Sequence, residues 1–298
     1  MKSSKKMIVA DILCLVVAAI WGSGFIASQM ALDANMSASL IMMTRFILAA
    51  VVMLIVCLPR LKRIQKREWK RGMLAGVFLY GAFFTQIIGQ KYTTVSHCAF
   101  FTATNVVIVP FIVWIVSGKR PSLKTFALTA ATLLGISVLS IQPGSFEFNF
   151  NFGDAMSLVC AVLFAMHIAC LGETDADADV MLVNLVQLST AAVISTVVYL
   201  LTDLGAASRV DWHLGLPAIL FLGLFSTCLC YFLQTLAQKY TTPAQAGVLL
   251  STEGLFGSLM SVLLGMEKVT ANLIVGGLII LTVVVLMELP TKKRAKKI

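Results

Sequence analysis

Long apolar runs separated by short charged breaks are the feature that most restricts the fold of this chain. Of its 298 residues, 59% are hydrophobic and only 12% are charged, whereas soluble domains contain about 25% charged residues. A helix that crosses ~30 Å of hydrocarbon needs about 20 residues. Ten such helices would use most of the chain, so the sequence predicts an all-α integral membrane protein without a separate soluble domain.

Polar and charged breaks divide the apolar sequence into ten predicted transmembrane helices. We place them at residues 8–30, 37–58, 72–89, 96–116, 123–141, 153–171, 180–201, 216–237, 243–264 and 272–287. The first apolar run is too long for a cleaved signal peptide, so we expect it to stay as the first span. Residues 1–142 and 143–298 are predicted as two five-helix repeats.

The distribution of Lys and Arg predicts the orientation in the membrane. With a cytoplasmic N-terminus, nineteen of these residues fall in inside segments and only Lys91, Arg209 and Lys268 in outside loops. This bias predicts a multi-pass protein of the cell (inner) membrane with both termini in the cytoplasm. The acidic loop at residues 173–179 also lies inside, but acidic residues contribute little to orientation. Because the cations are spread among loops, we do not expect nucleic-acid binding.

A short segment occurs once in each half of the chain. Residues 84–94 read FTQIIGQKYTT and residues 232–242 read FLQTLAQKYTT, an offset of 148. Each half holds five predicted helices, an odd number, so the second copy enters the bilayer from the opposite side. Two such inverted repeats can exchange shapes, which predicts a transporter that works by alternating access.

Two polar residues at matching positions are the first candidates for substrate binding. Glu253 lies near the middle of its predicted helix, where a charged side chain costs on the order of 2.5 to 3.5 kcal/mol. Its counterpart at the 148-residue offset is Asn105. We interpret Glu253 as a counter-charge for an amino group or as a proton-carrying site. The alternative for both residues is a hydrogen bond that holds neighbouring helices together.

Three further residues are predicted to line the transport pathway. Trp21 lies about 20 Å into the first helix and next to two glycines that would let a ligand come close. The alternative, an interfacial anchor, fits this depth less well than it fits Trp69 or Trp212. Gln86 and Gln234 occupy matching positions, which we predict near the two mouths of the pathway. The alternative for both glutamines is the capping of backbone groups.

Two histidines and one arginine also lie inside or beside apolar runs. Histidine is the side chain that ordinarily changes its charge near neutral pH, so His97 and His167 are candidates for proton coupling, or else packing residues. Arg45 lies deep in the second predicted helix, where it either pairs with a carboxylate or reaches toward an interface.

Motifs of several other protein classes are absent from the sequence. It contains no GxxxxGK[ST] phosphate loop, no HExxH and no GxSxG, which argues against an ATP-driven pump, a protease and a lipase. Its seven cysteines show no CxxC spacing. We therefore predict no cofactor, no metal and no enzymatic activity. A membrane enzyme that acts on lipid-linked substrates stays a remote alternative.

Several short motifs, taken in order, resemble the EamA-like permeases of the drug/metabolite transporter superfamily. These are WGSGF at residues 21–25, RFILAA at 45–50, YTT at 92–94, and Glu253 followed by LLG at 263–265. Gly254 stands where that family often has proline, and Met266 interrupts its L-L-G-E ending. The resemblance implies a ten-span carrier of small metabolites or toxic organic compounds, often moved outward, with amino acids prominent among the substrates.

Together these features predict a secondary transporter, an exporter of small organic metabolites. Amino acids or amine-bearing compounds are expected first, because one buried acid suits an ammonium group. The cavity is predicted between the first, third, fourth, sixth, eighth and ninth helices, and protons are a possible second partner. An uptake carrier for sugars, nucleosides or organic acids is the alternative.

Overall fold

A computed structural model describes the backbone of residues 2–93, 95–118, 120–140, 150–175, 177–263 and 269–288. Within these ranges the chain forms helices joined by short turns, and no strand occurs there. The elements are α1 (Lys2–Asp33), α2 (Ala38–Cys57), η1 (Leu58–Arg63), α3 (Lys66–Tyr92), α4 (Val95–Ala103), α5 (Asn105–Ser117), α6 (Leu123–Ser140), α7 (Phe152–Gly172), α8 (Val180–Thr202), η2 (Ala206–Arg209), α9 (Trp212–Leu220), η3 (Phe221–Leu229), α10 (Cys230–Gln238), α11 (Pro243–Leu250), α12 (Glu253–Leu263) and α13 (Ala271–Glu288).

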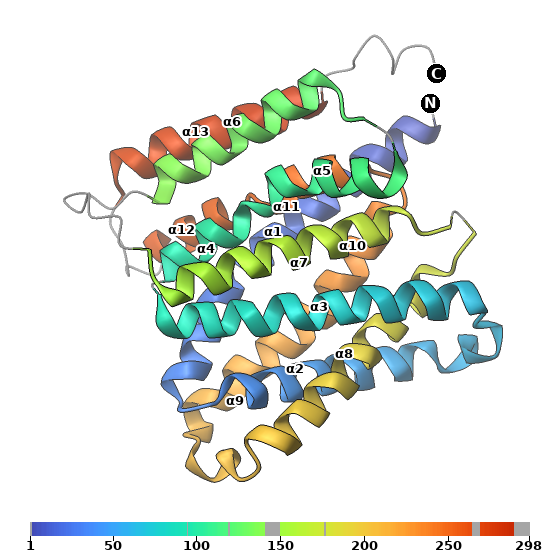
Figure 1. Ribbon diagram of the computed structural model, residues 1–298, viewed down its shortest axis with the longest axis vertical. Coiled ribbons are helices and arrows are strands. Elements are labelled where there is room, and N and C mark those ends of the chain that lie inside the picture. Colours follow the sequence, from blue (N-terminus) through green and yellow to red (C-terminus); the bar gives the residue numbers. More distant parts are fainter. Residues whose placement is uncertain are drawn as a thin grey trace.

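The two halves of the chain pack as an inverted repeat (Figure 1). Helix α1 of the first half packs against α9 to α12 of the second half. Helix α7, which corresponds to α1, packs against α3 to α5 of the first half, and these helices correspond to α9 to α12. In Figure 1, α1 runs from the right edge toward the left and α7 runs from left to right; α3 and the α9–α10 pair are opposed in the same way. Corresponding helices therefore run in opposite directions, as the odd number of predicted helices per half requires.

Seven of the described helical segments are long and apolar enough to cross a membrane. They are Lys6–Asp33, Ala38–Arg63, Lys66–Tyr92, His97–Ser117, Phe152–Gly172, Val180–Thr202 and Trp212–Gln238. Helices α6 and α13 contain shorter apolar stretches, and the ninth predicted helix is divided into α11 and α12. The chain is thus an all-helical multi-pass membrane protein, while the number of ten spans stays a prediction.

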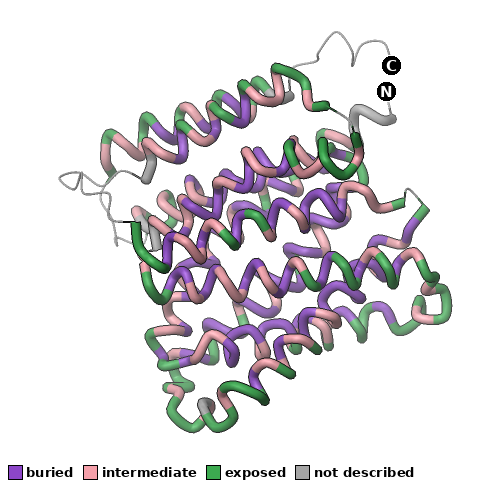
Figure 2. Tube along the Cα trace, in the orientation of Figure 1, coloured by how far each residue is buried: buried purple, intermediate pink, exposed green. Residues whose placement is uncertain are grey.

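Burial follows the expectation for a bundle surrounded by lipid. Figure 2 shows buried positions concentrated on the central helices, whereas α6 and α13, at one edge, carry many exposed and half-buried positions and fewer buried ones. Large apolar side chains such as Ile115, Leu201 and Leu263 are strongly exposed. In water such a surface would be unfavourable, but lipid tails are as apolar as these side chains.

The prediction of unbroken fourth and ninth helices is wrong. A break at Thr104 separates α4 from α5, and a break at residues 251–252 separates α11 from α12. The Thr104 hydroxyl donates to the carbonyl oxygen of Phe101 at 2.6 Å, and the Thr252 hydroxyl donates to that of Leu249, also at 2.6 Å. Such bonds to the preceding turn compete with the helical ladder and bend it. The two breaks match at the 148-residue offset, so they belong to the repeat.

The predicted eighth helix also departs from a regular α-helix. Helix α9 continues into the π-helix η3, which is followed by α10. The backbone N–H of Cys230 donates to the carbonyl oxygen of Phe225, five residues earlier, as a π-helix requires. The corresponding helix of the first half, α3, is continuous. This difference shows that the two halves share a scaffold without being identical.

Residues 177–179 of the acidic loop pack against the basic segment that follows α2. Arg60 Nη1 lies 3.0 Å from Asp179 Oδ2, and Arg67 donates to the carbonyl oxygen of Asp177 at 2.9 Å. From α10's end, Lys239 donates to the Ala178 carbonyl oxygen at 3.3 Å. The predicted topology puts these three segments on the same side of the membrane, and in the structure they lie together.

Glycines allow the close approach of α3 and α8. A Cβ atom on Gly76 would lie 2.6 Å from the carbonyl oxygen of Gln187, and one on Gly72 would lie 2.5 Å from the Cβ atom of Val186. Helix backbones in membranes approach this closely where small residues form the interface.

We expect Gly76→Ala to destabilise the protein by about 1–3 kcal/mol, because the added methyl group meets backbone that must move. The measurement is thermal or denaturant unfolding of the purified protein in detergent. Gly254→Ala is the matched control, since nothing lies within 4 Å of the added Cβ atom. Equal stability of the two variants would show that the α3–α8 contact is not close-packed.

Candidate functional site

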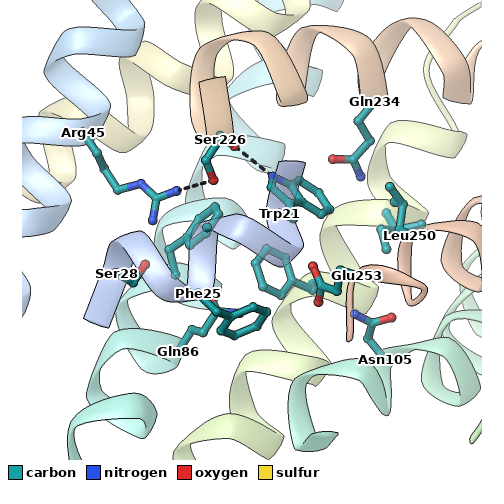
Figure 3. Close-up of a pocket in the computed structure, with 14 residues that line it drawn as sticks. Trp21, Phe25, Ser28, Arg45, Gln86, Asn105, Ser226, Gln234, Leu250 and Glu253 are labelled. Atoms are coloured by element: carbon teal, nitrogen blue, oxygen red, sulfur yellow. Dashed lines mark hydrogen bonds between the residues drawn. The ribbon is translucent and has the colours of Figure 1, made fainter. Parts of the chain in front are cut away.

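A cavity lies where helices from both halves meet (Figure 3). Side chains of α1, α2, α3, α5, α7, η3, α10, α11 and α12 line it. The aromatic lining residues are Trp21, Phe25, Phe83 and Phe164, and the polar or charged ones are Ser28, Arg45, Gln86, Asn105, Ser226, Gln234 and Glu253. The lining includes all six helices between which the cavity was predicted, and α2 in addition.

The five residues predicted to contact substrate surround this one cavity. They are Trp21, Gln86, Asn105, Gln234 and Glu253. The prediction that the two glutamines lie near opposite mouths is wrong, because both line the same cavity as the acid. Helix α3 continues past the predicted end of its span, which places Gln86 deeper than the sequence pattern indicated.

Two matched helix N-termini form part of the cavity wall. Asn105 is the first residue of α5 and Glu253 is the first residue of α12, each directly after a break. Both side chains are largely buried, with 7% of each residue exposed. A helix N-terminus carries a partial positive charge, so the α12 terminus stabilises the carboxylate of Glu253.

Trp21 and Glu253 are held beside each other by a glycine contact. A Cβ atom on Gly22 would lie 2.5 Å from the backbone nitrogen of Gly257 and 2.8 Å from the carbonyl oxygen of Glu253. Helix α1 therefore touches α12 backbone to backbone. The Trp21 ring lies 5.3 Å from that of Tyr231, and its indole N–H donates to the carbonyl oxygen of Ser226 at 2.8 Å. This places the indole as one rigid wall of the cavity.

Arg45 is a residue of this site that the sequence analysis did not count among the substrate contacts. It is 1% exposed, and its guanidinium lies 4.0 Å above the ring of Phe83. Its Nε atom donates to the Thr227 hydroxyl at 3.0 Å and its Nη2 atom to the Ser226 hydroxyl at 3.5 Å. Among the described residues no carboxylate pairs with it. The depth of Arg45 in an apolar helix is the feature of the sequence that could have pointed to this role.

Neither histidine lines the cavity. His167 is fully buried, with Nε2 lying 2.9 Å from the Gln187 side-chain oxygen. The Gln187 amide nitrogen donates to Asn184 and Thr235, so its oxygen must accept, and His167 carries its proton on Nε2. His97 lies near the start of α7, where Nδ1 is 3.4 Å from Asp154 Oδ1. Their predicted proton-coupling role stays a prediction.

A sequence model of the EamA-like transporter family matches the chain twice, over residues 8–141 and 151–289. The chain belongs to the EamA-like transporter family. An uncharacterized transporter from Archaeoglobus fulgidus is 28% identical over 286 residues, which are 95% of this chain and 87% of that protein. A solved crystal structure that is 16% identical shares the fold, with a TM-score of 0.75 over 95% of this chain and 96% of the other.

Family membership makes this EamA-like protein a membrane transporter, a class that is generally not enzymatic. Its partners are therefore a small-molecule substrate and the lipid bilayer. The two matched segments correspond to the two halves that pack around the cavity. A cavity formed jointly by two inverted halves is the place where repeat transporters bind their substrates.

We expect Thr227→Val to destabilise the protein by about 1–3 kcal/mol, because it removes the acceptor of a buried, charged N–H group. Unfolding of the purified protein in detergent measures the change. Thr282→Val is the control, since that exposed hydroxyl bonds only to the Leu278 carbonyl oxygen of its own helix. If Thr282→Val lost as much stability as Thr227→Val, the role given to the contact between Arg45 and Thr227 would be contradicted.

Proposed function

We propose that this EamA-like protein is a secondary transporter that exports small organic metabolites with an amino group, by alternating access. Amino acids and other amine-bearing compounds are the substrates expected first. The observation that carries the proposal is the position of Glu253, whose carboxylate lines a buried cavity between the two halves. A carboxyl group at such a place is costly unless it meets a cation or a proton.

The surroundings of Glu253 favour a cationic ligand. Within the part of the chain that the structure describes, no Lys, Arg or His forms an ion pair with this carboxylate. Aromatic rings, among them Trp21 and Phe164, form the neighbouring walls. Ring faces attract ammonium groups, and this attraction strengthens when water is excluded. Arg45 would favour an organic acid instead, but its Nε and Nη2 atoms donate to Thr227 and Ser226, and its guanidinium lies over the ring of Phe83.

Matched hydrogen bonds between the halves support alternating access. The Thr93 hydroxyl donates to Asp154 at 2.7 Å, and the Thr241 hydroxyl, at the matching position, donates to Asp11 at 3.0 Å. The first bond joins the end of α3 to the start of α7, and the second joins the end of α10 to α1. We assign these two contacts as gates that open in turn, because inverted halves exchange their conformations.

The size of the cavity agrees with closed gates. The volume that the centres of water molecules can occupy in it is about 30 Å³. This is room for one or two waters. Organic ligands fill pockets of roughly 300–1,000 Å³. Loading a substrate therefore requires that helices at one gate move apart.

Orientation and proton coupling complete the proposal. The bias of Lys and Arg toward one set of segments supports a cell-membrane protein with both termini in the cytoplasm. The outward direction rests on the resemblance to family members that often export. A proton and an ammonium group compete for Glu253, which couples outward amine movement to inward proton movement. His167 and His97 are additional candidates for carrying protons.

We expect Glu253→Gln to lower amine transport in proteoliposomes at least about 30-fold, because the buried ammonium loses its counter-charge. An imposed pH gradient should drive amine accumulation by the wild type and not by the variant. Radiolabelled amines, amino acids, sugars, nucleosides and organic acids form the substrate panel.

The matched control is Glu173→Gln, which makes the same change in a loop outside the cavity, and it should transport like the wild type. Unchanged transport and pH response in Glu253→Gln would refute the assignment of the carboxylate. Transport of sugars, nucleosides or organic acids without any amine would favour the alternative carrier.

A further inference from the structure

The cavity wall offers hydrogen-bond acceptors without partners, whereas several of its donors are already used. We infer from this that the site selects a primary ammonium group, which carries N–H donors, over a methylated ammonium group of the same charge. Gln234 and Asn105 provide the selective acceptors, and Gln238 is a positioning residue that orients Gln234. The inference rests on the proposed transport of amines.

Several N–H groups of the cavity wall already donate to other groups of the protein. The indole N–H of Trp21 donates to the Ser226 carbonyl oxygen at 2.8 Å. The Arg45 guanidinium donates to Thr227 and Ser226. All of these acceptors belong to the π-helix η3. A ligand could use these particular N–H groups only by displacing these bonds.

A chain of two amides fixes the orientation of Gln234. The Gln238 amide nitrogen donates to the Ile168 carbonyl oxygen at 2.8 Å, and that oxygen can only accept. The Gln238 side-chain oxygen therefore faces Gln234 and accepts from its amide nitrogen at 3.1 Å. The Gln234 side-chain oxygen is consequently the atom left for the cavity. It is buried and has no partner, and Figure 3 shows it pointing toward Trp21.

Asn105 and Glu253 extend this acceptor surface. The Asn105 side-chain oxygen is also buried without a partner, and the Glu253 carboxylate has no ion pair among the described residues. Buried acceptors without donors are unfavourable, so a ligand that supplies N–H groups gains by satisfying them. A trimethylated ammonium group satisfies the charge of Glu253 but offers no N–H to either amide.

The first half of the chain lacks this arrangement. Gln90 matches Gln238, and its amide nitrogen donates to the Phe25 carbonyl oxygen at 3.1 Å, in parallel with the bond to Ile168. The same nitrogen also donates to the side-chain oxygen of Gln29 at 3.2 Å. Gln90 thus anchors α3 to α1, and its side chain forms no hydrogen bond with that of the cavity residue Gln86. It provides a matched control for Gln238.

The test compares radiolabelled 2-phenylethylamine with its N,N,N-trimethylammonium analogue in proteoliposomes, at one pH and without a gradient. The wild type should transport the primary amine about tenfold or more in preference. Gln234→Met keeps the side-chain length but removes the acceptor, and it should lower this ratio about tenfold. Gln238→Leu should lower the ratio as well, because Gln234 is then free to turn its amide.

Gln90→Leu should keep the wild-type ratio, whatever its effect on the overall rate. A merely structural role of Gln238 would lower the transport of both compounds alike and leave their ratio unchanged. The inference is overturned if the wild type carries amines in a Glu253-dependent way but both the Gln234 and Gln238 variants keep its preference, or if it prefers the trimethylated compound. If the wild type carries neither amine, the proposed function itself is wrong, and the inference with it.

Discussion

The proposed binding site depends on one carboxyl group, that of Glu253, which is buried inside a bundle of membrane-spanning helices. Glu253 lies where lipid surrounds the bundle, and the surrounding structure makes this position tolerable. The N-terminus of α12 directs its partial positive charge at the carboxylate, and the contact between Gly22 and Gly257 fixes α12 against α1. Because a charge is costly there, the position of Glu253 is the observation on which the proposed function rests.

The two halves of the protein share a backbone arrangement but differ in the side chains that line the cavity. The breaks at Thr104 and Thr252 use the same hydroxyl-to-carbonyl bond in both halves, and they place matched helix N-termini at the cavity. Yet the first half has Asn105 at the position where the second half has Glu253. The second half also contains the π-helix η3, whereas the corresponding helix of the first half, α3, is a regular α-helix. In the proposed mechanism, the symmetry would let the two halves exchange conformations, and the differences would let the ligand bind in one orientation.

Much of the fold and part of the site followed from the sequence, for identifiable reasons. Lipid leaves few alternatives to helices, and the 148-residue offset related Asn105 to Glu253 before their shared cavity was known. The helix breaks were missed because threonine in an apolar run is common in continuous helices too. The depth of Gln86 and the contacts of Arg45 with η3 depend on how distant helices pack, which no local pattern records.

The most direct test of the account is whether a bound amine touches the Glu253 carboxyl group. Infrared difference spectra of the purified protein, recorded with and without an amine, detect a change in the carboxyl or carboxylate bands of a single side chain. The account predicts such a change in the wild type and its disappearance in Glu253→Gln. A spectrum in which amine binding leaves every carboxyl band unaltered, or alters them equally in the variant, would contradict it.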